Sequence, residues 1–463
     1  MTDSARRVRA LWDLTGGGPA AVHGLGFDGP EHIFNSPFAV TESAAVSIGA
    51  ATSAAADLLA ARDGPRQSVA IDRAHAAAAF SAERLLRVDG TRGDLWASLS
   101  GLYEARNGRF VQLHCNFPHH AAGVAACLGV REERSAFEGA IADWDAEELE
   151  TALIGAGMVG AMYRTTDEWD AHPHAAATRH LPALELTRLG EAGGRELPRA
   201  VRPLEDVRVL DCSRVLAGPV AGMTLASHGA DVLRVGADHL PVTGAVVATG
   251  FGKRNTNIDL RSDEGREVFS RLLAEADVVI DAFRPGALAA HGFGAEEMAR
   301  VRPGIVVVQI CAFDWDGPWG GRRGFDSIIQ TTTGIAMAAE DGRLVHLPAP
   351  DRQPTHLPVQ ALDHATGFLG AFVAMRGLAR RQAEGGSWLG RLSLLRTRNW
   401  LVGLGDGGAP DAVVDLEPYM HDVDSAFGEL TAVRSVGGLP ASPPRWERAP
   451  SEIGSAPAEW VSE

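Results

Sequence analysis

The sequence has almost no lysine and few cysteines. Lys253 is the only lysine among 43 basic residues, and the four cysteines are Cys115, Cys127, Cys212 and Cys311. They form no CxxC pair and no Cys/His cluster at ligand spacing, which argues against a structural zinc and against a disulfide framework. The first residues, MTDSARRVRALWDL, contain no apolar signal core, and no uninterrupted apolar run is long enough to span a membrane. We therefore expect a reduced, soluble, cytoplasmic protein.

The remaining composition describes an ordinary globular chain. With 463 residues, 45% of them hydrophobic and 22% charged, the sequence is long enough for two or three domains, each with its own core. The formal net charge of −16 disfavours non-specific binding to nucleic acid or to an acidic membrane surface. We therefore look for a small-molecule site rather than a polyanion-binding surface.

Short apolar runs alternate with helical patterns in the middle of the chain. The runs at 207–211, 231–235, 277–283 and 304–313 predict buried strands, and SDEGREVFSRLLAEA, with Ser262 as the N-cap, predicts one of the intervening helices. This alternation indicates an α/β fold with a doubly wound, Rossmann-like parallel sheet. Ligands of such sheets bind at the carboxyl ends of the strands, here in the loops after Asp211, Val235 and Asp281. The loop that follows the first strand contains no GxGxxG, so a nicotinamide dehydrogenase is disfavoured.

Composition changes along the chain predict three regions. Residues 1–200 contain Ala-rich helical runs at 44–62, 74–87, 119–128 and 146–156 with a few short strands, and predict a smaller α+β domain. Residues 201–400 form the Rossmann-like domain. Residues 401–463 are rich in Gly, Pro and Asp and predict a C-terminal tail that wraps over the surface.

A faint internal repeat relates the two larger regions. ESAAVSIGAATSAAADLLAARDGPRQSVAI begins at Glu42, and DHATGFLGAFVAMRGLARRQAEGGSWLGRLSL begins at Asp363. In both, an acidic residue opens a long helix of small residues that ends in Arg, a Gly turn and a strand. Glu42 is thus the counterpart of Asp363, and the chain reads as a rearranged or partly duplicated unit.

Four motifs in order over about 190 residues carry a family resemblance. They are RPLEDVRVLDCSRVLAGPVAGMTLASHGADVLRV, FGKRNTNIDLRSDEGREVFSRLLAEADVVIDAFRPGAL, GFDSIIQTTTGIAM and LPVQALDHATGFLGAF. Together they resemble the family III CoA-transferases, which include formyl-CoA transferases and α-methylacyl-CoA racemases. Residues from Glu42 to about Leu186 resemble the later part of the same family. Four ordered motifs are far more specific than any single short motif.

The resemblance implies a CoA-transferase that moves CoA between carboxylic acids through an aspartyl anhydride and thioester, with Asp363 as the nucleophile. A carboxylate can attack a thioester and then carry CoA itself, and a helix N-terminus keeps the carboxylate ionised. The alternative for Asp363 is an ordinary helix cap, and for Glu42 a vestigial helix start. For Asp326 a structural cap of the helix that follows it remains an even alternative, and for His364 a structural role is favoured.

The resemblance also implies the residues that bind coenzyme A. They come from the first loop, the second strand, the next strand and the third loop: Val215, Leu216, Ala217, Arg234, Lys253, Arg254, Phe283, Arg284, Pro285 and Gly286. The basic side chains would pair with the phosphates and the loops would line the pantetheine. Coenzyme A or acyl-CoA is then a substrate, with no tightly bound cofactor and no metal. A homodimer, in the family an interlocked one, is implied as well.

Several positions depart from the family pattern. Leu362 stands where the family has Gly before the nucleophile, Leu216 where a side-chain amide is available, and Ala312 and Asp314 where Gly is usual. Phe325 occupies the position of a racemase His, and phenylalanine cannot move a proton. Racemisation by that route is therefore disfavoured. Besides the transferase, two alternatives stay open: a catalytically degraded CoA-binding protein, which the other departures favour, and an acyl-CoA isomerase or racemase-like enzyme.

Overall fold

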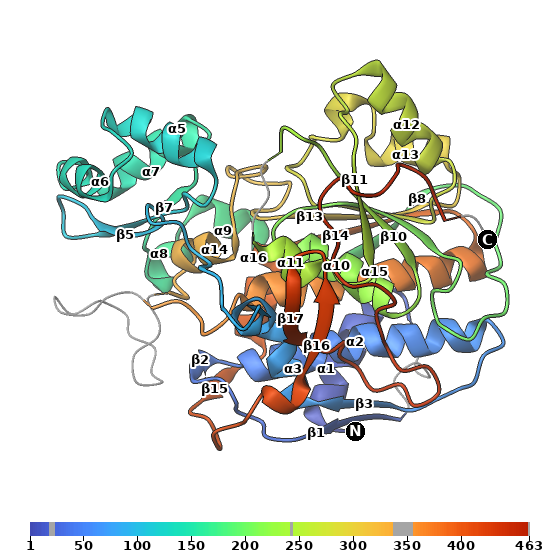
Figure 1. Ribbon diagram of the computed structural model, residues 1–463. Helices are drawn as coiled ribbons and strands as arrows, with labels where there is room; N and C mark the ends of the chain where they lie inside the picture. The colour runs from blue at the N-terminus through green and yellow to red at the C-terminus, as the bar shows by residue number, and fades with distance from the viewer. Residues whose placement is uncertain (18–23, 241–243, 337–354, 462–463) are drawn as a thin grey trace.

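The computed structural model describes residues 1–17, 24–240, 244–336 and 355–461. Its centre is one seven-stranded sheet in which six strands are parallel and the edge strand β8 is antiparallel to β14 (Figure 1). From one edge to the other the strands are β11 (Lys253–Asn257), β10 (Asp231–Gly236), β9 (Arg208–Cys212), β12 (Val278–Asp281), β13 (Val306–Cys311), β14 (Ser387–Ser393) and β8 (Glu185–Gly190). The mixed α/β class and the four predicted strands are confirmed.

Both faces of this sheet are buried. Alternate residues of the strands, such as Leu210 and Val279, belong to one core with α12 (Asp263–Leu273) and α13 (Ala295–Val301). The residues next to them, such as Val209 and Val278, belong to the main core with α10 (Ala217–Ser227) and α15 (Ala361–Glu384). Because side chains alternate across a strand, the nearly continuous apolar runs seen in the sequence are what a doubly covered sheet requires.

The long helix α2 (Val40–Ala61) packs beside α15 in the main core. Arg376 contacts Asp57 at 3.3 Å, and Gln382 Nε2 donates to the carbonyl of Ala61 at 3.0 Å, so the two helices run in the same direction. Within the described residues, α2 is the one helix long and apolar enough to cross a membrane, and 83% of its most apolar window is buried inside the protein. The core therefore joins residues on both sides of the predicted boundary at residue 200.

The internal repeat extends beyond the two helices. After α2 come β3 (Val69–Asp72) and α3 (Arg73–Phe80), and after α15 come β14 and α16 (Leu394–Gly403). Asp72 caps α3 and Ser393 caps α16, each through its side chain. Asp72 lies 30 residues after Glu42 and Ser393 lies 30 after Asp363, so helix, strand and capped helix match without a gap.

A separate small lobe stands at the upper left of Figure 1. Its antiparallel sheet of β5 (Gly101–Glu104), β6 (Phe110–Leu113) and β7 (Gly160–Met162) is covered by α5 (Pro118–Leu128), α6 (Arg134–Ile141) and α7 (Ala146–Gly155). Its own core contains Val111, Phe137 and Leu149.

The C-terminal region contains more regular structure than its composition predicts. β15 (Asp406–Gly408) pairs with β2 (Ser36–Phe38), and β16 (Met420–Ser425) and β17 (Gly428–Val433) form a hairpin that continues into β4 (Arg87–Val88). Beyond it, Trp446 and Trp460 donate to carbonyls of α10 and α12.

The other elements are α1 (Asp3–Asp13), β1 (Leu25–Asp28), α4 (Ala82–Leu85), α8 (Thr166–Asp170), α9 (Pro173–Thr178), α11 (Ala245–Thr249), α14 (Asp326–Thr332) and two 3₁₀ turns at Ala289–His291 and Glu417–Tyr419.

The close approach of α15 to α10 makes a testable prediction. A Cβ on Gly367 would lie 2.6 Å from Cβ of Val220 and 2.7 Å from the carbonyl oxygen of Ala217, whereas a Cβ on Gly139 of α6 would meet nothing within 4 Å. We expect Gly367→Ala to destabilise the fold by about 1–3 kcal/mol through overpacking. Gly139→Ala should stabilise it by about 0.5–1 kcal/mol, because alanine costs less backbone entropy in a helix. Thermal melts compare the two, and an unchanged or raised Tm of Gly367→Ala would contradict the close contact.

Candidate active site

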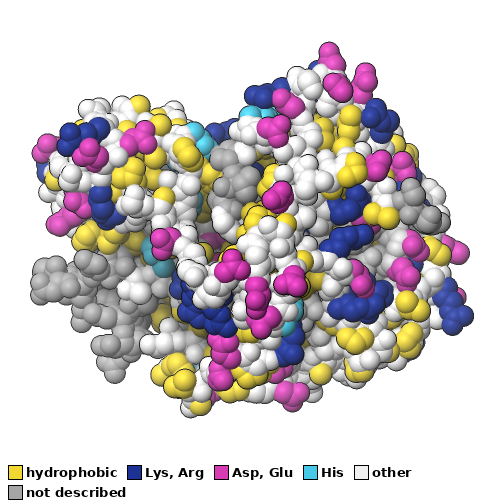
Figure 2. Space-filling model, in the orientation of Figure 1, with side chains coloured by type: hydrophobic (Ala, Val, Ile, Leu, Met, Phe, Trp, Pro, Cys, Tyr) yellow, Lys and Arg dark blue, Asp and Glu magenta, His cyan; other side chains and the backbone are white. Residues whose placement is uncertain are grey.

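A cavity of about 560 Å³ opens at the carboxyl ends of β9, β10, β12 and β13. Phe117, His119 and His120 of the small lobe form its opposite side. Figure 2 shows a notch between this lobe and the rest of the molecule. The volume of the cavity lies within the range typical of small-molecule sites, and its place is the one where ligands of parallel sheets bind.

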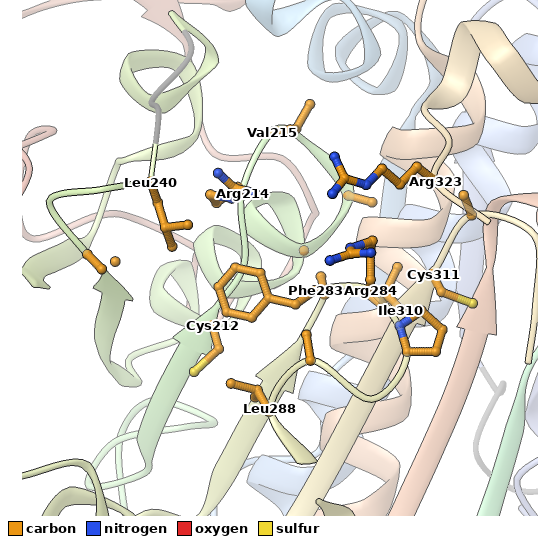
Figure 3. Close-up of a pocket in the computed structure, with 18 of the residues that line it drawn as sticks. Cys212, Arg214, Val215, Leu240, Phe283, Arg284, Leu288, Ile310, Cys311 and Arg323 are labelled. Atoms are coloured by element: carbon orange, nitrogen blue, oxygen red, sulfur yellow. The ribbon is translucent and has the colours of Figure 1, made fainter. Parts of the chain in front are cut away.

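The cavity brings together seven of the eleven residues predicted for the site. They are Asp363, Val215, Leu216, Ala217, Phe283, Arg284 and Pro285. Figure 3 shows Val215, Phe283 and Arg284 around the same space. Val215 has φ of 73°, a conformation that β-branched residues rarely adopt, so the first loop is strained where it meets the cavity. Leu216 also lines it, whereas Leu362 is fully buried in the main core and does not narrow it.

The other four predicted residues do not line the cavity. Lys253 is fully buried, and its Nζ donates to Asp211 at 2.7 Å and to the carbonyl of Pro219 at 2.6 Å. Arg254 is paired with Asp231 at 2.9 Å. The two charges that we assigned to phosphate binding are thus held inside the fold, since strand β11 directs them toward neighbouring acids. Arg234 is buried near Asp211, and Gly286 follows Pro285 just outside the lining.

Asp363 lies in the first turn of α15, and two groups hold it there. The N–H of Ala217 donates to its carboxylate, and its own N–H donates to Oδ2 of Asp326 at 2.8 Å. Gln360, the N-cap residue of α15, makes no side-chain capping bond. Asp326 therefore caps α15 from the start of α14, rather than capping α14 as its position in the sequence suggested.

The surroundings favour the protonated form of Asp363. Burial raises its pKa well above the usual value, and the negative charges of Asp326 and Glu83 raise it further, against the opposing hydrogen bond from Ala217. Burial also raises the pKa of Asp326 to about 6. We expected the helix terminus to keep Asp363 ionised; desolvation and two nearby carboxyl groups outweigh that effect.

The side chains of His364 and Glu42 are bound to other residues outside the cavity. Nε2 of His364 lies 2.8 Å from Glu83, and its ring stacks on Phe80 with centroids 5.3 Å apart. Glu42 accepts hydrogen bonds from Arg7 at 2.7 Å and from Ser4 at 3.0 Å. Neither residue lines the cavity. Glu42 thus occupies the helix position of Asp363 without its access to a ligand.

Most of the residues that line the cavity escaped the sequence analysis, among them three from the small lobe and two arginines. Phe117, His119 and His120 come from the small lobe, and Arg214 and Arg323 come from the loops before Ala217 and Asp326. Arg214 lies within the first motif and Arg323 directly before the third, so the positions of both arginines offered a signal. The small-lobe residues gave none, because they reach the cavity only through the tertiary fold. In the part of the chain that the structure describes, no group of three or more His, Cys, Asp or Glu residues is placed to hold a metal ion.

The raised pKa of Asp363 predicts a pH-dependent stability change in Asp363→Asn. A carboxyl whose folded-state pKa exceeds its unfolded value destabilises the fold increasingly as pH rises from about 4 toward the folded pKa. We therefore expect the amide to raise Tm by about 2 °C or more at pH 8 and by less at pH 5. Thermal melts of both proteins at the two pH values measure this, and an equal shift at both would refute the electrostatic explanation.

Comparison with known proteins bears on the same part of the chain. Residues 204–403 match the family model described as CoA-transferase family III. A probable fatty acyl-CoA transferase of Mycobacterium tuberculosis is 31% identical over 198 residues, covering 40% of this chain and 48% of the relative. A succinyl-CoA–D-citramalate CoA-transferase of Chloroflexus aurantiacus is 33% identical over 200 residues, with the same two shares. The chain thus spans about half the length of these curated relatives.

Among solved structures, a CaiB/BaiF family protein of Brucella suis is 28% identical, with 49% of this chain and 65% of that chain covered and a TM-score of 0.38. Because this TM-score is low, the likeness to the family depends on the sequence matches alone. The matched segment contains Asp363, Asp326 and the first and third loops, which are the motifs on which the resemblance was based. The similarity to CoA-transferase family III thus covers residues 204–403, which is less than half of the chain.

Proposed function

We propose that the protein is a CoA-transferase that moves CoA between carboxylic acids, with Asp363 as the nucleophile. The observation that carries the proposal is the position of Asp363 in the cavity wall, at a helix N-terminus and hydrogen-bonded to the first loop of a family III segment. The names of the curated relatives, which describe CoA-transferases, support the reaction class.

The proposed reaction needs only this carboxylate and the two substrates. The ionised Asp363 attacks the thioester carbonyl, the C–S bond breaks, and CoA thiolate leaves a mixed anhydride between Asp363 and the acyl group. The thiolate then attacks the aspartyl carbonyl, the first acid departs as carboxylate, and CoA is held as an aspartyl thioester. An acceptor carboxylate then attacks the aspartyl thioester, the C–S bond breaks, and CoA thiolate leaves a second anhydride between Asp363 and the acceptor. The thiolate attacks the acceptor carbonyl of this anhydride, which forms the new acyl-CoA and releases Asp363 as carboxylate.

Residues of the first and third loops support this chemistry in the proposal. Ala217 holds one carboxylate oxygen of Asp363 through its N–H, so that the other oxygen is directed at the thioester. The loops at 215–217 and 283–285 line the pantetheine arm, and Arg284 pairs with a phosphate. Closure of the cavity by substrate removes water, which strengthens each of these contacts.

Three finer interpretations belong to the same proposal. The strand order β11-β10-β9-β12-β13 corresponds to the 3-2-1-4-5 arrangement of doubly wound sheets, which supports a Rossmann-like description. A homodimer and a cytoplasmic location follow from the resemblance and the composition alone. Size-exclusion chromatography with light scattering tests the first of these two.

A CoA-binding protein without turnover is the second candidate, and one observation favours it. The raised pKa of Asp363 reduces the fraction of carboxylate near neutral pH, and a protonated carboxyl is a poor nucleophile. For a racemase, Phe325 lines the cavity where a proton-transfer group would be needed.

Trapping of the covalent intermediate tests the proposed reaction. After incubation with an acyl-CoA and hydroxylamine, mass spectrometry should find a hydroxamate on the peptide containing Asp363. Asp363→Ala should lower turnover by about 1000-fold or more. Glu42→Gln, which changes the equivalent position of the repeat, should retain turnover and label. Binding of acyl-CoA without any label would favour the CoA-binding candidate, and label on Glu42 would show that the other half of the repeat is catalytic.

The negative charge of Asp326 beside Asp363 leads to a prediction for the pH dependence of turnover. If Asp363 must ionise, kcat/KM falls at low pH as the carboxylate is protonated. Asp326→Asn removes one negative charge that raises the pKa of Asp363 but leaves an amide oxygen to accept its N–H. The acid limb of the kcat/KM profile should therefore move to lower pH in this variant. An unchanged limb would show that another group controls it.

A further inference from the structure

A histidine–carboxylate pair is buried next to the nucleophile in the chain. His364 follows Asp363 in α15, and its Nε2 lies 2.8 Å from Oε2 of Glu83 in α4. The two side chains are only 2% and 6% exposed. Glu83 belongs to the N-terminal region, outside the segment 204–403 that matches the family model. The proposed reaction uses neither residue, so the pair needs an explanation of its own.

The pair is enclosed by aromatic side chains and keeps polar atoms unpaired. The ring of His364 stacks on Phe80 with centroids 5.3 Å apart, and Phe80 also stacks on Phe368. Nδ1 of His364 and Oε1 of Glu83 are buried and have no hydrogen-bond partner among the described residues. A second cavity of about 30 Å³, large enough for a water molecule, lies beside the ring. Unpaired polar atoms are costly in such surroundings, which argues against a role in packing alone.

The state of the imidazole follows from its contact with Glu83. With Glu83 ionised, Nε2 carries the hydrogen of the 2.8 Å contact. Nδ1 is then the basic nitrogen of a neutral ring, and it is the atom that the fold leaves without a partner. The pair can therefore take up one proton, and the imidazolium so formed is held by a carboxylate.

Four titratable groups affect one another at the N-terminus of α15: Asp326, Asp363, Glu83 and His364. The negative charges of Asp326 and Glu83 raise the pKa of Asp363, in addition to burial. The positive charge of His364 opposes the rise that burial causes in the pKa of Asp326. His364 is the one member of this group that can become a cation, so it alone can balance a further carboxylate.

Two more charges lie near the pair, and both are on exposed side chains. Arg84 follows Glu83 in α4. Arg434 lines the second cavity together with His364, and its Nη2 donates to the carbonyl of Pro418. Because exposed charges are screened by solvent, the four buried groups depend mainly on one another.

Ionisation of Asp363 without another change would be costly. Asp326, Asp363 and Glu83 would then place up to three negative charges in one buried group, and an unbalanced charge is unfavourable there. A proton that moves from one member of the group to another leaves the net charge as it was. The arrangement thus favours a proton acceptor within the group over release of the proton to solvent.

Resting on the proposed function, we infer that the Glu83–His364 pair holds the proton that Asp363 gives up when it becomes the nucleophile. The O–H bond of Asp363 breaks, an N–H bond forms at Nδ1 of His364, and Glu83 stabilises the imidazolium. When Asp363 is released as carboxylate at the end of the reaction, the proton returns to it, so no proton is consumed. Glu83 and His364 are positioning residues, since they act through Asp363 and do not line the substrate cavity.

The acid limb of kcat/KM against pH is the first test. His364→Gln removes the basic nitrogen and leaves the charge of Glu83 unbalanced, so the limb should move to higher pH by about 1–2 units. The double variant Glu83→Gln/His364→Gln removes both charges and should return the limb to its wild-type position or below. A lowered Tm in His364→Gln with an unmoved limb would overturn the inference, because it would reveal a structural role only.

His228→Gln is the matched control for the pH profile. His228 is also buried, but it lies at the C-terminal end of α10 beside the charge of Arg202. Its replacement should leave the acid limb in place. A shift equal to that of His364→Gln would overturn the inference, since loss of any buried histidine would then have the same effect.

Nuclear magnetic resonance of the histidine rings tests the inference without turnover. In Asp363→Asn no proton can leave residue 363, so the titration midpoint of His364 should fall by about 1–2 pH units relative to the wild-type protein. The signal of His364 is identified by its loss in a His364 variant. Equal midpoints in the two proteins would overturn the inference even if acyl-CoA is turned over. The expected shift without turnover would support the exchange of a proton between the two residues and refute the proposed function.

Discussion

The N-terminus of α15 depends on a hydrogen bond between two acidic residues. Asp326 accepts the N–H of Asp363 and so supplies the cap that Gln360 does not. The same carboxyl group places a negative charge beside Asp363 and raises its pKa. The cap therefore stabilises the helix and opposes ionisation of its first-turn acid. Such a conflict is common at functional sites, where stability is given up for an arrangement that the substrate completes.

A buried ion pair in the sheet supports the first loop, which contacts Asp363. Lys253 on β11 reaches Asp211 on β9 and the carbonyl of Pro219 in the first turn of α10. This buried pair connects an outer strand to the start of α10, from which Ala217 donates to Asp363. Leaving either partner alone in the core would cost several kcal/mol, about 3–5 in comparable cases. The only lysine of the chain thus contacts Asp211 and the start of α10 and does not line the cavity.

Local patterns in the sequence predicted four strands of the seven-stranded sheet and several of the helices. The strand predicted at 231–235 is observed at 231–236, and the helices predicted at 119–128 and 146–156 are observed at 118–128 and 146–155. Apolar periodicity determines these elements, because each needs one or two buried faces. The resemblance placed Asp363 and the first and third loops, and these do meet in one cavity.

Long-range contacts account for what the sequence could not predict. Lys253 and Arg254 stood in a family motif, yet the acids that hold them, Asp211 and Asp231, are distant in the chain and become neighbours only through strand pairing. The cap that Asp326 gives to α15 links residues 37 positions apart. His120 approaches Arg323 across 203 positions. No local pattern encodes such pairs, so side-chain roles were less predictable than elements.

The internal repeat shows that the residues around an acidic side chain decide whether it lines a cavity. Glu42 and Asp363 are acidic residues at equivalent places of two matching units, and their helices α2 and α15 lie side by side in one core. Helix α1 brings Arg7 and Ser4 to Glu42 and neutralises it within the fold. At Asp363 the fold brings a second acid, a backbone N–H and a cavity that the small lobe closes with Phe117 and His120. The proposed reaction therefore assigns the nucleophile to Asp363 and not to Glu42, because Asp363 lines the cavity and Glu42 does not.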